Sequence, residues 1–176
     1  MHVTVTLTTL CNTAREAPDP PERMLKRKPT VKNIARYIAG DPPGAKYRWG
    51  MIAYVGDEHV GNLYLQMRTD CLNGLAAAGL KQWQGPTKKY TQMTFEQLAQ
   101  TDASAVIRDM YPRDGLVAVE HDATTHLSPF CVSALYYSLR HPDRITAQFS
   151  PDPLHPARFY NDGNLVAILM PVRNPV

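Results

Sequence analysis

The residues best suited to chemistry lie in the segment EHDATTH, where His121, Asp122 and His126 supply two imidazoles and a carboxylate. Such groups can bind a metal ion or transfer protons. A metal-binding histidine pair on a helix is usually spaced i, i+4, whereas these two are five residues apart and no third ligand is near. We therefore interpret the segment as a polar loop between a strand and a helix, and we expect no metal and no cofactor.

Cysteine chemistry is the second option. Cys11, Cys71 and Cys131 are sixty residues apart and form no CxxC pair, so neither a zinc module nor a disulfide scaffold is indicated. Cys131 falls inside an apolar helical pattern, where thiols are mostly unreactive. There is also no glycine-rich phosphate loop, because GDPPG contains two prolines and opens no helix. We expect a protein that is not an enzyme, with a small α+β nuclease or hydrolase as the alternative.

Charge is unevenly distributed along the 176 residues. Residues 1–89 hold 13 Lys and Arg against 7 Asp and Glu, whereas residues 90–176 hold 6 against 9. Within the basic half, Lys28, Lys32 and Arg36 recur every four residues, which places them in one row on a helix. Such a row is either a surface that contacts a polyanion or an ordinary solvated face.

The first half of the chain predicts a strand over 2–10 and a long loop over 14–29, which contains four prolines. A helix follows from Thr30, a candidate N-cap, to Gly40, and its apolar residues recur at i, i+3, i+4 and i+7. Two strands, over 48–56 and 59–70, flank a turn at Asp57 and Glu58. Residues 71–83 show no clear period, and residues 84–92 read as a polar connector.

The second half predicts two short helical pieces within 94–111 and a strand over 115–122. Ser128 and Pro129 open a helix that closes before Pro142. Three strands follow over 144–150, 157–162 and 164–172, the last two joined by a hairpin turn at Asp162 and Gly163. The order of elements predicts a single α+β domain over 1–176 built from duplicated β-α-β-β-β units, with two main helices packed on antiparallel sheet. Repeat one covers about 1–83, a connector about 84–93, and repeat two about 94–176.

The C-terminal segment DPLHPARFYNDGNLVAILMPVR resembles the close of bacterial DNA polymerase processivity clamps, the β sliding clamps. Those chains typically end in an Asp-Pro-Leu-x-Pro turn, one strand, a short turn and a final strand that finishes in Met-Pro-Val/Met-Arg. The matching positions here are Asp152, Pro153, Leu154, Pro156, Leu169, Met170, Pro171, Val172 and Arg173.

A weaker resemblance lies at the end of the first predicted repeat. Clamps carry Thr-Asp-Gly-x-Arg-Leu-Ala there, and this chain has Thr69 and Asp70, with Cys71 and Asn73 in place of the glycine and the arginine. The resemblance implies a DNA-clamp-like domain. It covers roughly the last fifty residues by motif and the rest of the chain only by the order of elements.

A clamp encircles duplex DNA and tethers DNA polymerases or other clamp-binding proteins. The resemblance implies DNA contacts from Lys28, Lys32, Arg36 and Arg140, which closes the second main helix. The family's ring contains six domains, so this chain would form a homo-oligomeric ring of about six copies. The alternative is a clamp-fold regulatory module that engages replication proteins without encircling DNA. We expect a cytoplasmic protein with no membrane contact.

The resemblance also implies a pocket for short partner peptides. Its walls would come from Thr69, Leu72, Leu75, Met170, Pro171 and Val172. Such a pocket needs apolar walls that exclude water from an anchoring side chain. The competing interpretation is that Met170 and Val172 simply complete a core strand.

Overall fold

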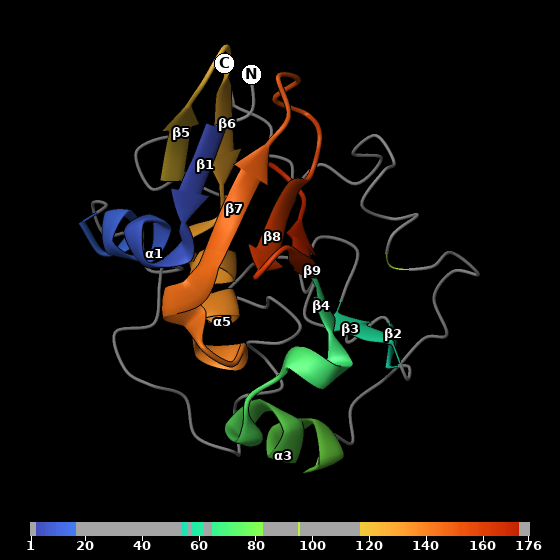
Figure 1. Cartoon of the computed structure of the whole chain (residues 1–176). Helices are drawn as coiled ribbons and strands as arrows, with labels where there is room; N and C mark the ends of the chain where they lie inside the picture. Colours follow the sequence, from blue (N-terminus) through green and yellow to red (C-terminus); the bar gives the residue numbers. More distant parts are fainter. Residues whose placement is uncertain are drawn as a thin grey trace.

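The computed structural model describes residues 3–16, 54–55, 58–61, 65–82, 95 and 117–172 (Figure 1). These residues form a mixed α+β fold, as the sequence predicts at the level of fold class. Its centre is a seven-stranded sheet in the order β1-β7-β8-β9-β4-β3-β2, and a separate hairpin is formed by β5 and β6. The strands are β1 (Val3–Thr6), β2 (Tyr54–Val55), β3 (His59–Gly61), β4 (Leu65–Arg68), β5 (Val117–Glu120), β6 (Thr124–Leu127), β7 (Ile145–Phe149), β8 (Ala157–Asn161) and β9 (Asn164–Leu169).

Three α-helices occur among the described residues, α1 (Leu7–Glu16), α3 (Gly74–Gln82) and α5 (Pro129–Ser138). Two single turns of 3-10 helix, η1 (Thr69–Cys71) and η3 (Pro142–Arg144), connect helices to strands. α1 packs against α5, and their buried side chains join those of β7, β8 and β9 in one hydrophobic core. Within the described ranges, no helix is long and apolar enough to cross a membrane.

The antiparallel meander β7-β8-β9 is the best-predicted part of the fold. Residues of β7 alternate between buried and half-buried, which is the period-two pattern of a strand with one core face. Asp162 and Gly163, with φ of 49° and 80°, form the tight turn between β8 and β9. Positive φ at both turn positions matches the right-handed twist of the strands they join, which explains why an Asp-Gly pair stands here.

The predicted helix after Ser128 is also confirmed. Ser128 accepts a hydrogen bond from the Cys131 backbone N–H at 3.3 Å, and Pro129 occupies the first turn. Proline fits there because its missing N–H would have no partner inside the helix. α5 ends at Ser138 with Leu139 as its C-cap, and Pro142 begins the following 3-10 turn, so the helix closes before Pro142 as predicted.

The strand predicted over 2–10 is wrong beyond Thr6, where α1 begins. Thr6 Oγ1 accepts the Thr9 N–H at 3.1 Å and so caps the helix. The apolar residues of α1 recur at i, i+3, i+4 and i+7, and all are buried: Leu7, Leu10, Cys11 and Ala14. This helical period lay hidden because β-branched residues alternate through the preceding strand.

Three further boundaries differ from prediction. The strand predicted over 59–70 is divided into the antiparallel pair β3 and β4, because the chain turns after Gly61. Gly61 has φ of 154°, and a Cβ there would overlap the Leu65 carbonyl oxygen. Residues 71–83, which showed no period, contain α3, and the predicted loop around His121 contains β6. The predicted helix from Thr30, the loop 14–29, the connector and the helical pieces in 94–111 lie outside the described residues, apart from the ends at 14–16 and the single helical residue Phe95.

Candidate functional site

The predicted DNA-contacting row of Lys28, Lys32 and Arg36 lies outside the described residues, so its role stays a prediction. The fourth residue of that set, Arg140, is exposed and follows Leu139, the C-cap residue of α5. The Arg140 guanidinium donates a hydrogen bond to the Asp70 backbone carbonyl. The Arg140 backbone N–H donates to the Cys71 carbonyl at 2.9 Å. Arg140 therefore holds η1 against the end of α5.

The described side chains of α1 and α5 offer little charge for DNA. Eight of the ten residues of α5 are buried, so this helix has no broad solvent face. On α1, the exposed described side chains are neutral: Thr9, Asn12 and Thr13. Neutral side chains do not replace the counterions of a phosphate backbone. The described side chains of α1 and α5 therefore supply no strong electrostatic contact with a duplex.

The six residues predicted to line a peptide pocket fall into two separate groups. β4 pairs antiparallel with β9, so that Leu65 lies opposite Leu169 and Met67 opposite Ala167. Thr69, which follows β4, therefore lies near the start of β9. Met170 lies just beyond the end of β9. At a rise of about 3.3 Å per residue the two groups are roughly 15 Å apart along the strands.

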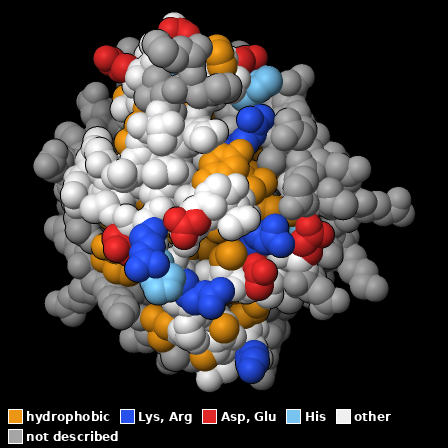
Figure 2. All heavy atoms as spheres, viewed as in Figure 1, with side chains coloured by type: hydrophobic (Ala, Val, Ile, Leu, Met, Phe, Trp, Pro, Cys, Tyr) orange, Lys and Arg blue, Asp and Glu red, His pale blue; other side chains and the backbone are white. Residues whose placement is uncertain are grey.

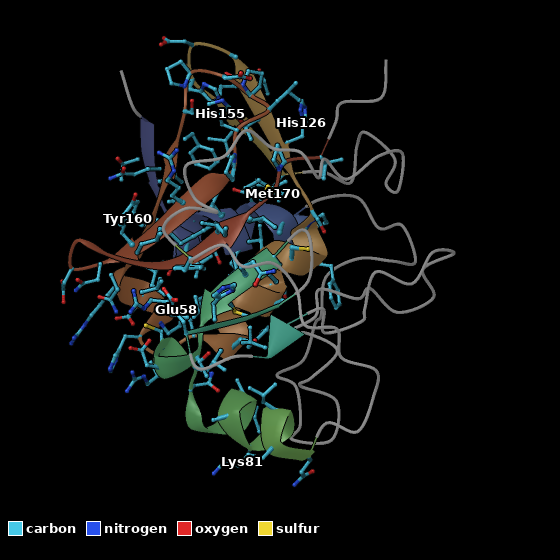
Figure 3. The ribbon with its side chains drawn as sticks, turned by 90° about the vertical axis from the view of Figure 1, so that its right-hand side faces the viewer. Glu58, Lys81, His126, His155, Tyr160 and Met170 are labelled. Atoms are coloured by element: carbon cyan, nitrogen blue, oxygen red, sulfur yellow. The ribbon has the colours of Figure 1, made fainter. Side chains whose placement is uncertain are left out.

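In Figure 3, Met170 lies toward the end that carries His126 and away from Lys81 of α3. Met170 and Val172 are 5% and 3% exposed. The Val172 N–H donates to the His126 carbonyl at 2.7 Å, which extends pairing past β9. Their burial is what the core-strand interpretation requires. Within one chain the structure does not bring the six residues together, and their part in binding a partner stays a prediction.

Around Thr69, Leu72 and Leu75, the sequence reasoning missed a junction between η1 and α5. Leu72 pairs with Leu139 in an isolated antiparallel bridge. The Asn73 N–H donates to the Ser138 carbonyl at 2.8 Å. Together with the Arg140 contacts, these bonds form a short ladder between residues 70–73 and 138–140.

Asn73 is the centre of this junction. Its Oδ1 accepts the Ala76 N–H at 2.8 Å and so caps α3, while its Nδ2 donates to the Tyr137 carbonyl at 2.6 Å. An asparagine is a strong N-cap because its side chain satisfies a backbone N–H that the helix leaves unpaired. The residue that departs from the clamp motif thus has a structural role of its own. An Asn before an Ala-rich run was the sequence signal for it.

Beside the junction lies an open cavity of about 200 Å³, which we call the junction cavity. Three of its lining residues are apolar and buried, and Arg140 and His141 are exposed. The lining residues are Cys71, Leu139, Arg140, His141, Ile145, Asn161 and Val166. Among the described residues, Asn161 Oδ1 is buried without a hydrogen-bond partner. No local sequence pattern indicates this cavity, because its lining comes from η1, the α5–β7 connection, β7, β8 and β9.

Charged side chains surround the cavity. Figure 2 shows Lys or Arg side chains and a histidine, interspersed with acidic side chains, over the region where β7 begins. Arg68 Nε lies 3.4 Å from Asp70 Oδ1. Exposed charges at this corner of the molecule also include Arg144, Asp143 and Asp162. The two signs are mixed, so the corner as a whole is no strongly positive surface.

The thiols near these elements are poor nucleophiles. Burial raises the pKa of the fully buried Cys131 thiol from the ordinary 9.0 to about 12, against a smaller opposing effect of the Ser128 hydrogen bond. Burial, followed by the hydrogen bond and charge of Asp70, raises the pKa of Cys71, and Arg68 and Arg140 only partly offset this. A thiol with a raised pKa carries little of the reactive thiolate near neutral pH.

The segment that first suggested chemistry is a hairpin rather than a loop. β5 and β6 pair so that Glu120 faces Thr124, and His121 lies in the turn between them. His121 Nε2 is 2.7 Å from Thr125 Oγ1, and its ring stacks on Phe149 at a centroid distance of 6.2 Å. No group of three or more His, Cys, Asp and Glu side chains suited to a metal occurs in the described part of the chain.

Comparison with known proteins gives no relative: no family model, no curated protein and no solved structure matches this chain.

Proposed function

We propose that the protein is a non-enzymatic sliding-clamp-like protein that assembles into a ring around duplex DNA and tethers replication or repair proteins. The order of elements carries the proposal. β1 leads into α1 and β6 leads into α5, and in the described chain each helix is followed by a three-stranded antiparallel set, β2-β3-β4 or β7-β8-β9. This order supports a proposal of two β-α-β-β-β units, with α3 and β5 outside them and with α1 in place of the helix predicted from Thr30.

The pairing of strands adds support. The third strands of the two sets, β4 and β9, pair with each other at the point where the sets meet in the sheet. α1 and α5, the corresponding helices, also pack together. The correspondence stops at the first strands, because β1 joins the sheet beside β7 whereas β6 pairs with β5. The C-terminal Met-Pro-Val-Arg resemblance supports the same proposal independently of the topology.

The DNA contact in this proposal rests on Lys28, Lys32 and Arg36. A clamp must slide, so its cations act on phosphates through distance and water rather than through specific bonds to bases. Arg140 contributes less than the row, because its guanidinium is already engaged with Asp70 of the same chain.

A second function is favoured by one observation. The exposed described side chains of α1 are neutral, and α5 is mostly buried. Such helices suit a clamp-fold module that binds replication proteins without encircling DNA. The two functions predict opposite results for the same DNA-binding measurement.

The test is the salt dependence of binding to a short duplex for the double variant Lys32→Glu, Arg36→Glu. If the row contacts phosphates, the variant loses salt-sensitive binding, and the slope of log affinity against log salt falls by about 2. Lys81→Glu, an exposed charge reversal on α3, is the matched control and should bind as the unaltered chain does. Equal binding by all three chains would contradict the DNA-contacting row, and an unaltered chain that binds no duplex would favour the module that does not encircle DNA.

A further inference from the structure

Asn73 is followed by Gly74, and this is the sole Asn-Gly pair in the sequence. Asn-Gly pairs are prone to spontaneous deamidation, because glycine has no side chain to shield its backbone nitrogen from the asparagine amide. Asn73 is half-buried, and Gly74 is exposed at the start of α3. The pair is therefore a candidate for slow chemical modification, and the contacts of Asn73 decide when the reaction can occur.

Deamidation at this pair needs water and no enzyme. The Gly74 backbone nitrogen attacks Asn73 Cγ, and the new bond closes a cyclic imide. The bond from Cγ to Nδ2 breaks, and ammonia leaves with the proton that the Gly74 nitrogen has lost. Water then adds to one of the two imide carbonyls and opens the ring to aspartate or isoaspartate. A neutral amide is thereby replaced by a carboxylate.

The folded chain holds the Asn73 amide away from this reaction. Asn73 Oδ1 accepts the Ala76 N–H of α3 at 2.8 Å, and Nδ2 donates to the Tyr137 carbonyl of α5 at 2.6 Å. The Asn73 backbone N–H donates to the Ser138 carbonyl at 2.8 Å. An amide held at both ends cannot turn onto the Gly74 nitrogen without breaking these bonds. Deamidation should therefore require a local opening of the junction.

The product of deamidation fits the junction poorly. The carbonyls of Tyr137 and Ser138 lie at the C-terminal end of α5, where a helix carries partial negative charge. Asn73 Nδ2 supplies a proton to that end. A carboxylate has no proton to donate and brings a charge of the same sign. It would therefore be repelled by the carbonyl that the amide now binds.

The same carboxylate suits α3. The N-terminal end of a helix carries partial positive charge, and aspartate caps a helix about as well as asparagine does. The bond to the Ala76 N–H can therefore survive the change, whereas the bond to Tyr137 cannot. Conversion to aspartate should separate α3 from α5 without unfolding α3.

We propose that Asn73 is a deamidation site and that its conversion releases η1 and α3 from the end of α5. The closed junction protects the amide, each opening gives the reaction a chance, and the product disfavours closing again. The change is one-way, because hydrolysis releases ammonia. The inference uses only contacts between residues 70–77 and 137–140, so it holds whether or not the protein encircles DNA.

The chemistry is tested by peptide mass spectrometry of the chain after incubation at mildly alkaline pH, folded and in urea. Conversion at Asn73 should be at least roughly tenfold slower in the folded chain. Gly74→Ala is the matched control, because a Cβ at position 74 meets no atom within 4 Å. Its methyl group hinders the attack, so conversion in urea should slow several-fold. Equal rates in the folded and unfolded chains, or undiminished conversion in Gly74→Ala, would contradict the site.

The release is tested by hydrogen exchange in Asn73→Asp. The Arg140 N–H donates to the Cys71 carbonyl across the junction, whereas the Ala77 N–H donates to the Asn73 carbonyl beside α3. Exchange at Arg140 should rise roughly tenfold, and exchange at Ala77 should stay as it is. Asn12→Asp puts the same charge on the exposed face of α1 and should change neither. Unchanged exchange at Arg140, or an equal rise at Ala77, would overturn the release.

Discussion

α1 and α5 are both preceded by a strand and pack against each other, yet they bury their surfaces differently. α1 is amphipathic, with one buried apolar stripe, and its exposed side chains that the structure describes are neutral. α5 is apolar almost all round, and its half-buried positions are Tyr136 and Tyr137. A helix that is apolar on every side belongs in a core, whereas one with a single apolar stripe forms an outer layer.

The difference means that α5 is part of the structural core, whereas the outer face of α1 is open to solvent. α5 fixes the start of β7, and through Tyr137 and Ser138 it also fixes the loop before α3. Changes on α5 should therefore alter stability everywhere. Changes on the outer face of α1 should alter stability little, so any function of that face can be measured without unfolding the protein.

The largest expected effect is at Phe130, 1% exposed on α5. Phe130→Ala removes a large ring from a closed core and leaves a cavity, so it should lower the free energy of unfolding by about 3–5 kcal/mol. Urea unfolding followed by circular dichroism measures this. A loss of unfolding free energy below about 1 kcal/mol would contradict the burial of Phe130 in the core.

The next effect is a loss of stability in alkali that comes from Cys131. Its pKa is raised from 9.0 to about 12, so the stability it contributes is fully present below pH 9 and is lost as pH rises toward 12. Over that window the loss should approach about 1.4 kcal/mol per pH unit. The Cys131→Ala variant should show a shallower decline between pH 9 and pH 10, and identical slopes would contradict the burial of this thiol.

Smaller effects are expected at the two N-caps. Ser128 caps α5 and is fully buried, so Ser128→Ala should cost about 1–2 kcal/mol. Thr6 caps α1 in solvent, where water can replace the lost bond, so Thr6→Ala should cost about 0.5–1 kcal/mol. Chemical unfolding of the two variants in parallel measures the two losses of stability. A larger loss for Thr6→Ala than for Ser128→Ala would contradict the distinction between the buried and the exposed helix.

The smallest effect is expected at Asn12, exposed on α1. Asn12→Ala should change the free energy of unfolding by no more than about 0.5 kcal/mol, because the side chain leaves the core untouched. Thermal unfolding checks this, with Leu10→Ala on the buried stripe of the same helix as the destabilised reference. A large loss of unfolding free energy in Asn12→Ala would show that the outer face of α1 packs against other residues rather than facing solvent.

Strands whose signals are local were predictable from sequence. β7, β8 and β9 carry their own alternation and the Asp162-Gly163 turn, and α5 carries Ser128 and Pro129. α1 was hidden because β-branched residues run straight into its first turn. β3 and β4 were read as one strand because the close approach of the Leu65 carbonyl to Gly61 is a contact that no local pattern shows.

The candidate site was less predictable because it depends on long-range pairing. The register of β4 against β9 places Thr69 and Met170 at opposite ends, and no local pattern records that register. The junction of Asn73 with Tyr137 joins residues 64 positions apart. The cavity beside it exists only once five segments have come together.

Encirclement of duplex DNA is tested most directly by retention on closed circular DNA. The protein is mixed with a circular duplex, washed at high salt to remove electrostatic binding, and compared before and after one cut by a restriction enzyme. The proposed ring predicts that protein stays on the circle at high salt and is released when the circle is made linear. Loss of the protein at high salt from circular and linear DNA alike would contradict the ring.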